Sequence, residues 1–440
     1  MSKATSMRRA SAASLMGSVL EWYDFYLYGT AAALVLGKLY FPHSDPSTAT
    51  ILALLTFASG FLTRPVGAVI FGHFGDRVGR KSMLVITMMI MGGATLGIGL
   101  VPTYESWGIW ASVTLVALRL TQGVAIGGEW GGATLLTVEN SPVGRRGFYG
   151  SVPQLGAPIG LLLSAGVYAI VSQLPDAQFL SWGWRVPFLL SGLLLVAGLW
   201  VRLGITETVA FTAVKEQGRK AALPIVTLLR YHWKETLLAL GARLADAATF
   251  NVINVFAISY ASSTLHLSGS VVLTGFTISS AVQILLIPLF GSLSDRIGRR
   301  PVYIAGAALC GVGVFGYFWA LSTASTVVIW VAIILMHAVG TGLMFAIQSS
   351  FFSEMFGTDV RYSGISVGYQ MAALVGGAPT PAIAAALVAW ASGASWPVSV
   401  YLLIMCAITV GCVLVVGETR KRDLVRPAGA DTEEPEAVSR

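Results

Sequence analysis

The chain has 440 residues, of which 55% are hydrophobic and only 11% are charged, and its formal net charge is +7. Soluble domains carry about 25% charged residues, so this chain has too few to cover a surface that faces water. The composition excludes a soluble globular domain and predicts an all-α integral membrane protein, because helices satisfy their own backbone hydrogen bonds in lipid.

Twelve apolar segments are each long enough to cross a membrane, which takes about 20 residues of helix. They lie near 14–41, 50–72, 82–101, 108–138, 148–171, 184–203, 233–262, 270–292, 301–321, 325–353, 362–390 and 396–417. The longest polar interruption separates six spans from six. The predicted domains are a cytoplasmic N-tail (1–13), an N-terminal six-helix bundle (14–203), a cytoplasmic central loop (204–232), a C-terminal six-helix bundle (233–417) and a cytoplasmic C-tail (418–440).

Lys and Arg residues gather in the loops on one side of the predicted spans. Basic residues in the loops at 77–81, 145–146, 296–300 and 420–422 contrast with "PHSDPST" and "PTYESW", which contain none. Such loops stay on the cytoplasmic side of a membrane. Both ends of the chain are therefore predicted to be cytoplasmic, as an even number of spans requires.

The two sets of spans carry an internal repeat. The loop "GHFGDRVGRK" at 72–81 returns as "GSLSDRIGRR" at 291–300, an offset of 219 residues. Two further matches are Glu139 and Arg146 with Glu354 and Arg361 at an offset of 215, and Gln154 with Gln370 at 216. Repeats of this kind predict duplicated halves. Two six-helix halves related about the membrane normal are the architecture of a large class of secondary transporters.

The charged loop residues are predicted to latch the halves together on the cytoplasmic face. Asp76 and Asp295 lie at helix ends, where a carboxylate can accept hydrogen bonds from the N-terminal amides of a helix. A role in membrane topology alone is the alternative, but it would require neither the acids nor the repeated spacing. The predicted gate consists of Gly72, Asp76, Arg77, Gly79, Arg80, Glu139, Arg146, Asp295, Arg296, Arg299, Glu354 and Arg361.

Ionisable residues inside the spans cost at least ~2.5–3.5 kcal/mol each at mid-membrane, so each is a candidate for function. Arg119 keeps its charge at accessible pH and requires an anion. We expect Asp24 in span 1 to be that anion, with Glu129 as the second choice. A proton on Asp24 would free Arg119 for a carboxylate cargo; a static ion pair is the alternative. The predicted proton-coupling residues are Asp24, Arg119, Glu21 and Glu129.

Other polar residues of the spans are candidates for lining a cavity. Arg243 and Asp246 can line it or only satisfy each other, since they are three residues apart on one helix. His337 is interpreted as a packed or water-facing residue, with a proton relay as the alternative. Arg64 is left open between a role at a helix end and contact with water. The predicted substrate-binding residues are Tyr28, Arg119, Gln122, Gln154, Arg243, Asp246, Asn254, Tyr369 and Gln370.

Motifs for enzyme chemistry are missing from the sequence. It contains neither a phosphate-binding G-x-x-x-x-G-K-[ST] nor an H-E-x-x-H motif, and Cys310, Cys406 and Cys412 all fall in apolar runs. We predict no enzyme activity, no metal site and no cofactor.

Five segments in chain order resemble one known family: "EWYDFYLYG", "GHFGDRVGRK", "RLTQGVAIGGEWGG", "SWGWRVPF" and "SEMFGTDVRYSG". They are similar to the metabolite:proton symporter family of the major facilitator superfamily, over about residues 14 to 417. "RYSGISVGYQMAALVGG" and "FSEMFG" most resemble the shikimate permease branch. The family's signatures map onto Gly72, Asp76, Arg77, Gly79, Arg80 and Lys81, and onto Arg119, Gln122 and Gly123.

The resemblance implies proton-driven uptake of a small carboxylate across a bacterial inner membrane, by alternating access to a cavity between two bundles. A shikimate-like hydroxy acid is favoured, then 2-oxoglutarate or another organic acid. The expected partners are this acid, protons and lipid, with no nucleic acid, and the chain is expected to act as a monomer. An exporter of the same fold and a non-transporting membrane sensor are the alternatives.

Overall fold

The computed structural model of the protein describes residues 3–142, 144–204, 207, 211–212 and 224–424, and every regular element in this part of the chain is helical. The predicted all-α fold is therefore confirmed. Much of the predicted central loop (204–232) and of the predicted C-tail (418–440) lies outside the described residues.

The N-terminal half is built from long helices joined by short ones. The long helices are α1 (Lys3–Ala31), α3 (Pro46–Arg77), α4 (Arg80–Leu100), α6 (Ile109–Val138), α8 (Gly156–Val171) and α10 (Val186–Leu203). The short elements are the π-helical η1 (Ala32–Leu36), α2 (Gly37–Tyr40), α5 (Tyr104–Trp107), α7 (Arg146–Ser151), η2 (Pro153–Leu155), α9 (Asp176–Ser181) and η3 (Gly183–Arg185).

The C-terminal half follows the same plan but is interrupted more often. Its helices are α12 (Pro224–Tyr231), α13 (Trp233–Asn251), α14 (Ala257–Ser263), α15 (Gly269–Ile297), α16 (Arg299–Ser322), α17 (Thr326–Ile333), α18 (Gly342–Met355), α19 (Arg361–Ala372), α20 (Thr380–Trp390) and α21 (Trp396–Val416). The π-helical stretches η4 (Val252–Phe256), η5 (Ile334–Thr341) and η6 (Ala373–Gly377) break three of its spans. Such stretches are rare and often mark functional positions in helices.

Within the described part of the chain, eleven helical segments are long and apolar enough to cross a membrane. The remaining predicted span is α1, which is long enough but carries Glu21 and Asp24 near its middle. It packs against α6, α8 and α10 inside the N-terminal half. Residues 3–13, predicted as a tail, are instead the first turns of α1. α12 lies in the predicted central loop.

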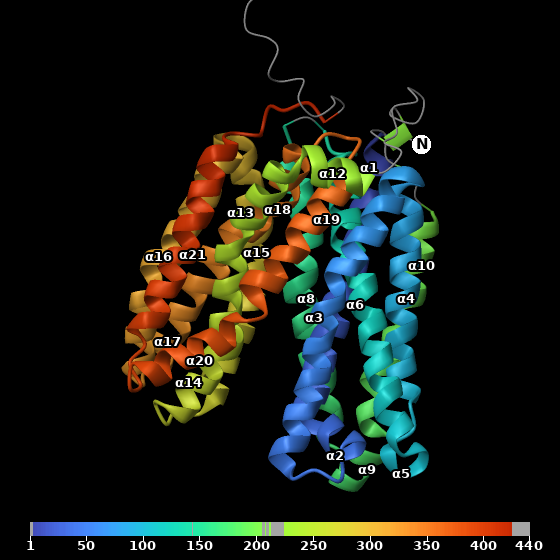
Figure 1. The fold of residues 1–440 in the computed structure, drawn as a ribbon, viewed down its shortest axis with the longest axis vertical. Coiled ribbons are helices and arrows are strands. Elements are labelled where there is room, and N and C mark those ends of the chain that lie inside the picture. Colours follow the sequence, from blue (N-terminus) through green and yellow to red (C-terminus); the bar gives the residue numbers. More distant parts are fainter. Residues whose placement is uncertain (1–2, 143, 205–206, 208–210, 213–223, 425–440) are drawn as a thin grey trace, which may run out of the picture.

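The two halves lie side by side in Figure 1, with α1 to α10 coloured blue to green and α13 to α21 yellow to red. The ribbons come together at the end that holds α12 and spread apart at the other end, near α2, α5, α14 and α17. The start of α1 and the end of α21 lie at the closed end, as an even number of crossings requires. That this end faces the cytoplasm remains a prediction from its basic loops.

Candidate functional site

The closed end is held by carboxylates that reach from one half to the other. Asp76, in the last turn of α3, accepts hydrogen bonds from the backbone amides of Tyr362 and Ser363 at 3.1 and 2.9 Å, and from the Ser363 hydroxyl at 2.8 Å. These amides open α19 in the other half. A carboxylate is stabilised there by unsatisfied N–H groups and by the helix dipole.

The repeat builds the same contact in the opposite direction. Asp295, in the last turn of α15, accepts from the amides of Gly147 and Phe148 at 2.8 Å each. These amides belong to α7, in the N-terminal half. Each half thus caps a helix of the other, and the duplicated loop explains why the contact occurs twice.

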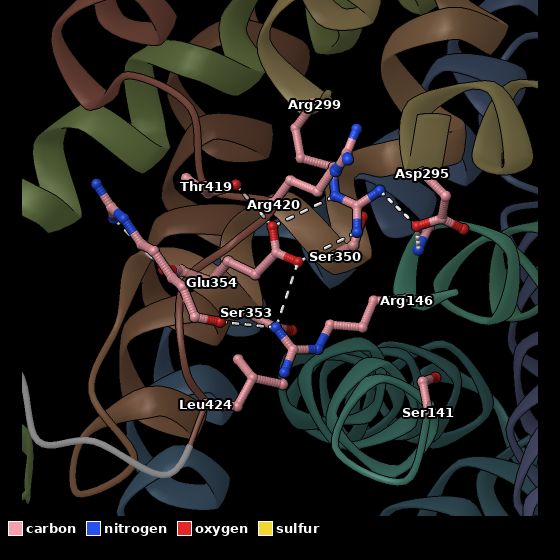
Figure 2. A network of polar contacts seen from close by, with 12 residues as sticks. Ser141, Arg146, Asp295, Arg299, Ser350, Ser353, Glu354, Thr419, Arg420 and Leu424 are labelled. Carbon is pink, nitrogen blue, oxygen red and sulfur yellow. Dashed lines mark hydrogen bonds and ion pairs between the residues drawn. The ribbon is translucent and has the colours of Figure 1, made fainter. Parts of the chain in front are cut away.

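Two glutamates join the gate arginines across the same interface. Glu139 lies 3.0 Å from Arg361 of the other half and 3.5 Å from Arg80 of its own. Glu354 correspondingly lies 4.0 Å from Arg146 of the other half and 3.2 Å from Arg299 of its own, as Figure 2 shows. All of these side chains are buried or nearly so, so the bonds form where water screens them little.

Two predicted gate residues take no part in these bonds. Arg77 and Arg296 have exposed side chains, and Arg296 contributes only its backbone carbonyl, which accepts from Arg420. Arg80 and Arg299 begin the next helices, α4 and α16, and their guanidinium groups lie 3.6 and 2.8 Å from Asp76 and Asp295. Arg77 and Arg296 still belong to the last turns of α3 and α15, where their side chains are exposed. Their role as basic loop residues that set the membrane topology stays a prediction.

Glycines allow the halves to approach at the gate. A Cβ atom on Gly72 would lie 2.8 Å from Cα of Ser363, and one on Gly291 would lie 2.6 Å from the carbonyl oxygen of Gly147. Gly79 and Gly298 adopt φ angles of 136° and 107°, a region that other residues rarely enter. They turn the chain sharply between consecutive spans.

The segment 418–424, which the sequence predicted only as the start of a cytoplasmic tail, also contacts the gate. Thr419 donates to Glu354 at 2.6 Å (Figure 2), and Arg146 donates to the carbonyl of Arg422 at 2.7 Å. Arg361 donates to the carbonyl of Leu424 at 2.8 Å. The polar composition of this segment did not indicate the role, because a sequence does not distinguish an exposed tail from a segment that packs on the protein.

Three residues predicted to bind substrate lie instead in the seam between the halves. Gln154 donates to the carbonyl of Phe345 at 2.8 Å, and Gln370 donates to that of Ile126 at 3.3 Å. The ring of Tyr369 stacks on that of Trp130 at 3.6 Å between centroids. Each contact joins the N-terminal half to the C-terminal half, so the seam closes the path between them.

Asp24 and Arg119 do not form the predicted direct ion pair in the structure and are linked through other side chains. Asp24 accepts from Thr95 at 2.5 Å, Thr95 accepts from Gln122 at 2.7 Å, and Gln122 accepts from Arg119 at 3.0 Å. The guanidinium of Arg119 also lies over the ring of Tyr28, 4.5 Å from its centroid. Depth along a helix does not specify distance across a bundle, and polar neighbours fill the gap.

Glu129, the second choice for Arg119, has another partner. It forms an ion pair with Arg202, near the end of α10, and accepts from Thr87 at 2.5 Å. Glu129 and Arg202 are both fully buried. Glu21 is buried as well, and its Oε2 has no hydrogen-bond partner among the described residues.

A cavity lies between the two halves, lined by charged and aromatic residues from both. Of the predicted substrate-binding residues it contains Arg243 and Asp246, together with Arg64 and His337, which the sequence left undecided or interpreted as packed. The predicted residues that do not line it are Tyr28, Arg119, Gln122, Gln154, Asn254, Tyr369 and Gln370. The residues by which α1 lines the cavity are aromatic: Trp22, Phe25 and Tyr26.

Arg64 and Arg243 bring two positive charges to this cavity, one from each half. Arg64 lies over Phe61 and Phe25, 4.2 and 5.2 Å from the ring centroids. Arg243 lies 3.2 Å from the ring centroid of Tyr369 and donates to its carbonyl at 2.6 Å. In the described part of the chain neither forms an ion pair within 4.0 Å, and the Nε of each has no partner.

Two family models match the chain. A model described as "Sugar (and other) transporter" matches residues 10–227, and one described as "Major Facilitator Superfamily" matches residues 238–438. The boundary between them falls in the region that separates the two halves of the structure.

Two relatives are similar over almost the whole chain. The shikimate transporter of Escherichia coli (strain K12) is 42% identical over 419 residues, which cover 94% of this chain and 95% of the relative. The inner membrane metabolite transport protein YhjE of the same organism is 38% identical over 426 residues, covering 95% and 96%.

The fold is shared with a solved sugar transporter. The structure of the proton:xylose symporter XylE bound to 6-bromo-6-deoxy-D-glucose superposes with a TM-score of 0.77 at 17% identity. The match covers 96% of this chain and 98% of that one.

Proposed function

Because this chain belongs to the major facilitator superfamily and within it to the metabolite:proton symporters, we propose that it imports a small hydroxylated carboxylate together with protons. The chain is a multi-pass membrane transporter and not an enzyme. Our proposal adds the cargo, the direction and the driving force: an acid of the shikimate type enters a bacterium through its inner membrane. The proton gradient drives this uptake without a cofactor, and a single chain carries it out.

The observation that carries the proposal is the pair of cavity arginines. Arg64 comes from α3 and Arg243 from α13, so each half supplies one guanidinium. An arginine cannot lose its charge at accessible pH, and a buried charge is costly unless it is paired. With Asp246 as the single carboxylate of the described lining, a carboxylate cargo supplies the missing anion and forms charge-assisted hydrogen bonds.

Binding at Arg243 would reach the seam directly. Its guanidinium lies against Tyr369, whose ring stacks on Trp130 of the other half. A carboxylate that draws Arg243 toward the cavity would weaken this contact, and with it one of the bonds that keep the halves together. Cargo would thereby favour the rearrangement that alternating access requires, since a ligand shifts an equilibrium only through different contacts in the two states.

Proton coupling is proposed to act through the buried acids of α1. Asp24 has one oxygen without a hydrogen-bond partner among the described residues and is linked to Arg119 through Thr95 and Gln122. Protonating Asp24 would remove a negative charge from this chain of hydrogen bonds and change the partners available to Arg119. Glu21, one turn away, is a second buried acid that can take up a proton.

Uptake by proteoliposomes tests the proposal. With an imposed proton gradient we expect concentrative uptake of radiolabelled shikimate that a protonophore abolishes. Arg64→Gln and Arg243→Gln should each weaken binding about 10- to 150-fold, as expected for hydrogen bonds to a charged group worth about 1.5–3 kcal/mol. Arg296→Gln, which removes an exposed arginine, is the matched control and should bind normally.

The coupling step has a separate test. Asp24→Asn should abolish uptake against a gradient while exchange of labelled for unlabelled cargo continues. Full accumulation by this variant would exclude Asp24 as the coupling acid. Uptake in wild type that a protonophore leaves unchanged would exclude proton symport. Binding of shikimate by both arginine variants as tightly as by wild type would exclude the carboxylate site.

A further inference from the structure

The cavity has two chemically different walls. The N-terminal half contributes Arg64 and mainly aromatic rings, those of Trp22 and Tyr26 among them, whereas most of the neutral hydrogen-bonding side chains come from the C-terminal half. These side chains are Asn251, Ser280, Gln283, His337 and Thr341. A cargo that carried only a carboxylate would need the two arginines, one on each wall, and none of these neutral side chains. The C-terminal wall therefore indicates further polar groups on the cargo.

His337 is the most firmly held residue of the hydrogen-bonding wall. It lies in the π-helical stretch η5 and is 3% exposed. Its Nδ1 is 3.0 Å from the Ser279 hydroxyl, and its carbonyl accepts from Gln283 at 3.3 Å and from Thr341 at 2.6 Å. The ring also packs on Phe276 at 4.5 Å between centroids. Neighbours from α15 thus fix both the backbone and the plane of the ring.

The second ring nitrogen of His337 is left for the cargo. None of the hydrogen bonds among the described residues uses Nε2, although the side chain lines the cavity. If Nδ1 donates to Ser279, Nε2 is an acceptor; if Nδ1 accepts, Nε2–H is a donor. A hydroxyl group satisfies either form because it both donates and accepts, whereas a carboxylate or an ammonium group satisfies only one.

We propose that His337, oriented by Ser279, is a specificity-determining residue that recognises a hydroxyl group of the cargo. The transporter then selects ring-shaped monocarboxylates that carry hydroxyls over acids of the same shape without them. This inference rests on the proposed function, because the carboxylate must first be placed by Arg64 and Arg243. Aromatic side chains of the N-terminal wall, Trp22 and Phe25 among them, would then cover the apolar face of the ring.

The energetic basis is the cost of an unpaired polar group. A site that holds a buried hydrogen-bonding group rejects a cargo that lacks the matching group, because the site's own group is then left unsatisfied at about 1–3 kcal/mol. This corresponds to a preference of about 5- to 150-fold. Replacing His337 by an apolar residue should remove the preference rather than all binding.

The test measures binding of two acids to the purified full-length protein by isothermal titration calorimetry. Shikimate is compared with cyclohex-1-ene carboxylate, which has the same ring and carboxylate but no hydroxyls. Wild type should prefer shikimate at least 5-fold. His337→Leu should weaken shikimate about 10-fold and change binding of the hydroxyl-free acid less than 2-fold, so the second acid also reports that the variant is folded.

Further variants separate recognition from structure. Ser279→Ala should lower the preference partly, because the ring loses its orienting partner, and His337→Asn should keep part of it through its amide. His43→Leu, at an exposed site outside the cavity, is the control and should behave as wild type. If His337→Leu weakens binding of both acids equally, or if wild type shows no preference for shikimate, this inference is overturned while the proposed function stands. If neither acid binds to wild type, the proposed function fails as well.

Discussion

Asp76 at the end of α3 and Asp295 at the end of α15 make the same bonds to opposite halves, and Glu139 and Glu354 repeat each other in the same way. The interiors of the halves differ. At the offset of 219 that relates the two loops, Asp24 of α1 corresponds to Arg243 of α13. The acid is turned into its own bundle and bonded to Thr95, whereas the arginine lines the cavity.

The same divergence occurs one span later. Arg64 of α3 corresponds to Gln283 of α15 at this offset, and both line the cavity, one with a charge and one with an amide. A gate closes two symmetric halves and benefits from two copies of each bond. The cargo that we propose has one carboxylate end and one hydroxylated end and is asymmetric, so each half can contribute a different group. The comparison therefore separates residues that serve closure from those that serve recognition.

The largest effect is expected where the N-terminal half has a buried ion pair that the gate repeat does not include. Glu129→Gln leaves Arg202 as an uncompensated buried charge, which should destabilise the protein by about 3–5 kcal/mol. Thermal unfolding in detergent measures the loss. The double variant Glu129→Leu with Arg202→Met should recover most of the stability, since an apolar pair needs no counterion. A double variant as unstable as the single one would contradict this account.

The second effect concerns closure in both halves. Gly291→Ala and Gly72→Ala would each place a methyl group against the backbone of the other half, at 2.6 and 2.8 Å. Overpacking of this kind costs about 1–3 kcal/mol, and only when the gate is closed. Spin labels on Arg77→Cys and Arg296→Cys should therefore report a larger open population by electron paramagnetic resonance distances.

Gly93→Ala is the matched control for these variants, because a Cβ atom there would meet nothing within 4 Å. It should leave the distance distribution unchanged. If Gly291→Ala opened the gate and Gly72→Ala did not, the two copies of the contact would not be equivalent in closure.

A smaller effect is expected for the capping acids themselves. Asp76→Asn and Asp295→Asn keep an acceptor oxygen but lose the charge, and bonds to charged groups exceed neutral ones by about 1 kcal/mol. Each should raise the ratio of open to closed gate roughly 5-fold in the same spin-label measurement. Asp76 accepts three bonds and Asp295 two from the other half, so Asp76→Asn should have the stronger effect. The reverse order would show that the number of accepted hydrogen bonds does not determine how strongly each variant opens the gate.

The smallest effect is expected at Glu418. Glu207 accepts hydrogen bonds from the amides of Arg80 and Lys81 in the first half. In the second half, Glu418 accepts in the same way from the amides of Arg299 and Arg300. Burial alone would raise the pKa of Glu418, but these amides and that of Arg420 hold it below its ordinary value. The ionised carboxylate therefore stabilises the segment at neutral pH, and this contribution disappears as pH falls through the lowered pKa.

Hydrogen exchange of residues 418–424 measures this attachment. Protection in wild type should be constant from pH 7 to about pH 5, once intrinsic exchange is corrected for, and should fall in strongly acidic solution. Glu418→Gln should show weaker protection at neutral pH and little further change with acid. Protection that rises as pH falls would have the wrong sign for a carboxylate with a lowered pKa.

Much of the architecture followed from patterns with a direct physical cause. Apolar length predicted twelve spans, and in the described part of the chain eleven helical segments are long and apolar enough to cross a membrane. The repeated loop predicted that Asp76 and Asp295 lie at helix ends, and each accepts hydrogen bonds from the first turn of a helix in the other half. Arg77 and Arg296 were assigned to the gate only because the loop as a whole was. The cavity was less predictable: Arg64 and His337 are single polar residues in apolar helices, and nothing in such a helix tells which face meets the other half.

The sequence by itself determined that the chain crosses a membrane, that it consists of two related halves and that carboxylates link them, because hydrophobicity, charge placement and repeats are properties of the chain. Only the tertiary structure decided that Arg119 bonds to Gln122, that Glu129 pairs with Arg202 and that Arg64 and Arg243 share a cavity. Those outcomes depend on the rotation of each helix about its axis. Packing among neighbouring helices sets this rotation, and two residues at equal depth can face toward or away from each other.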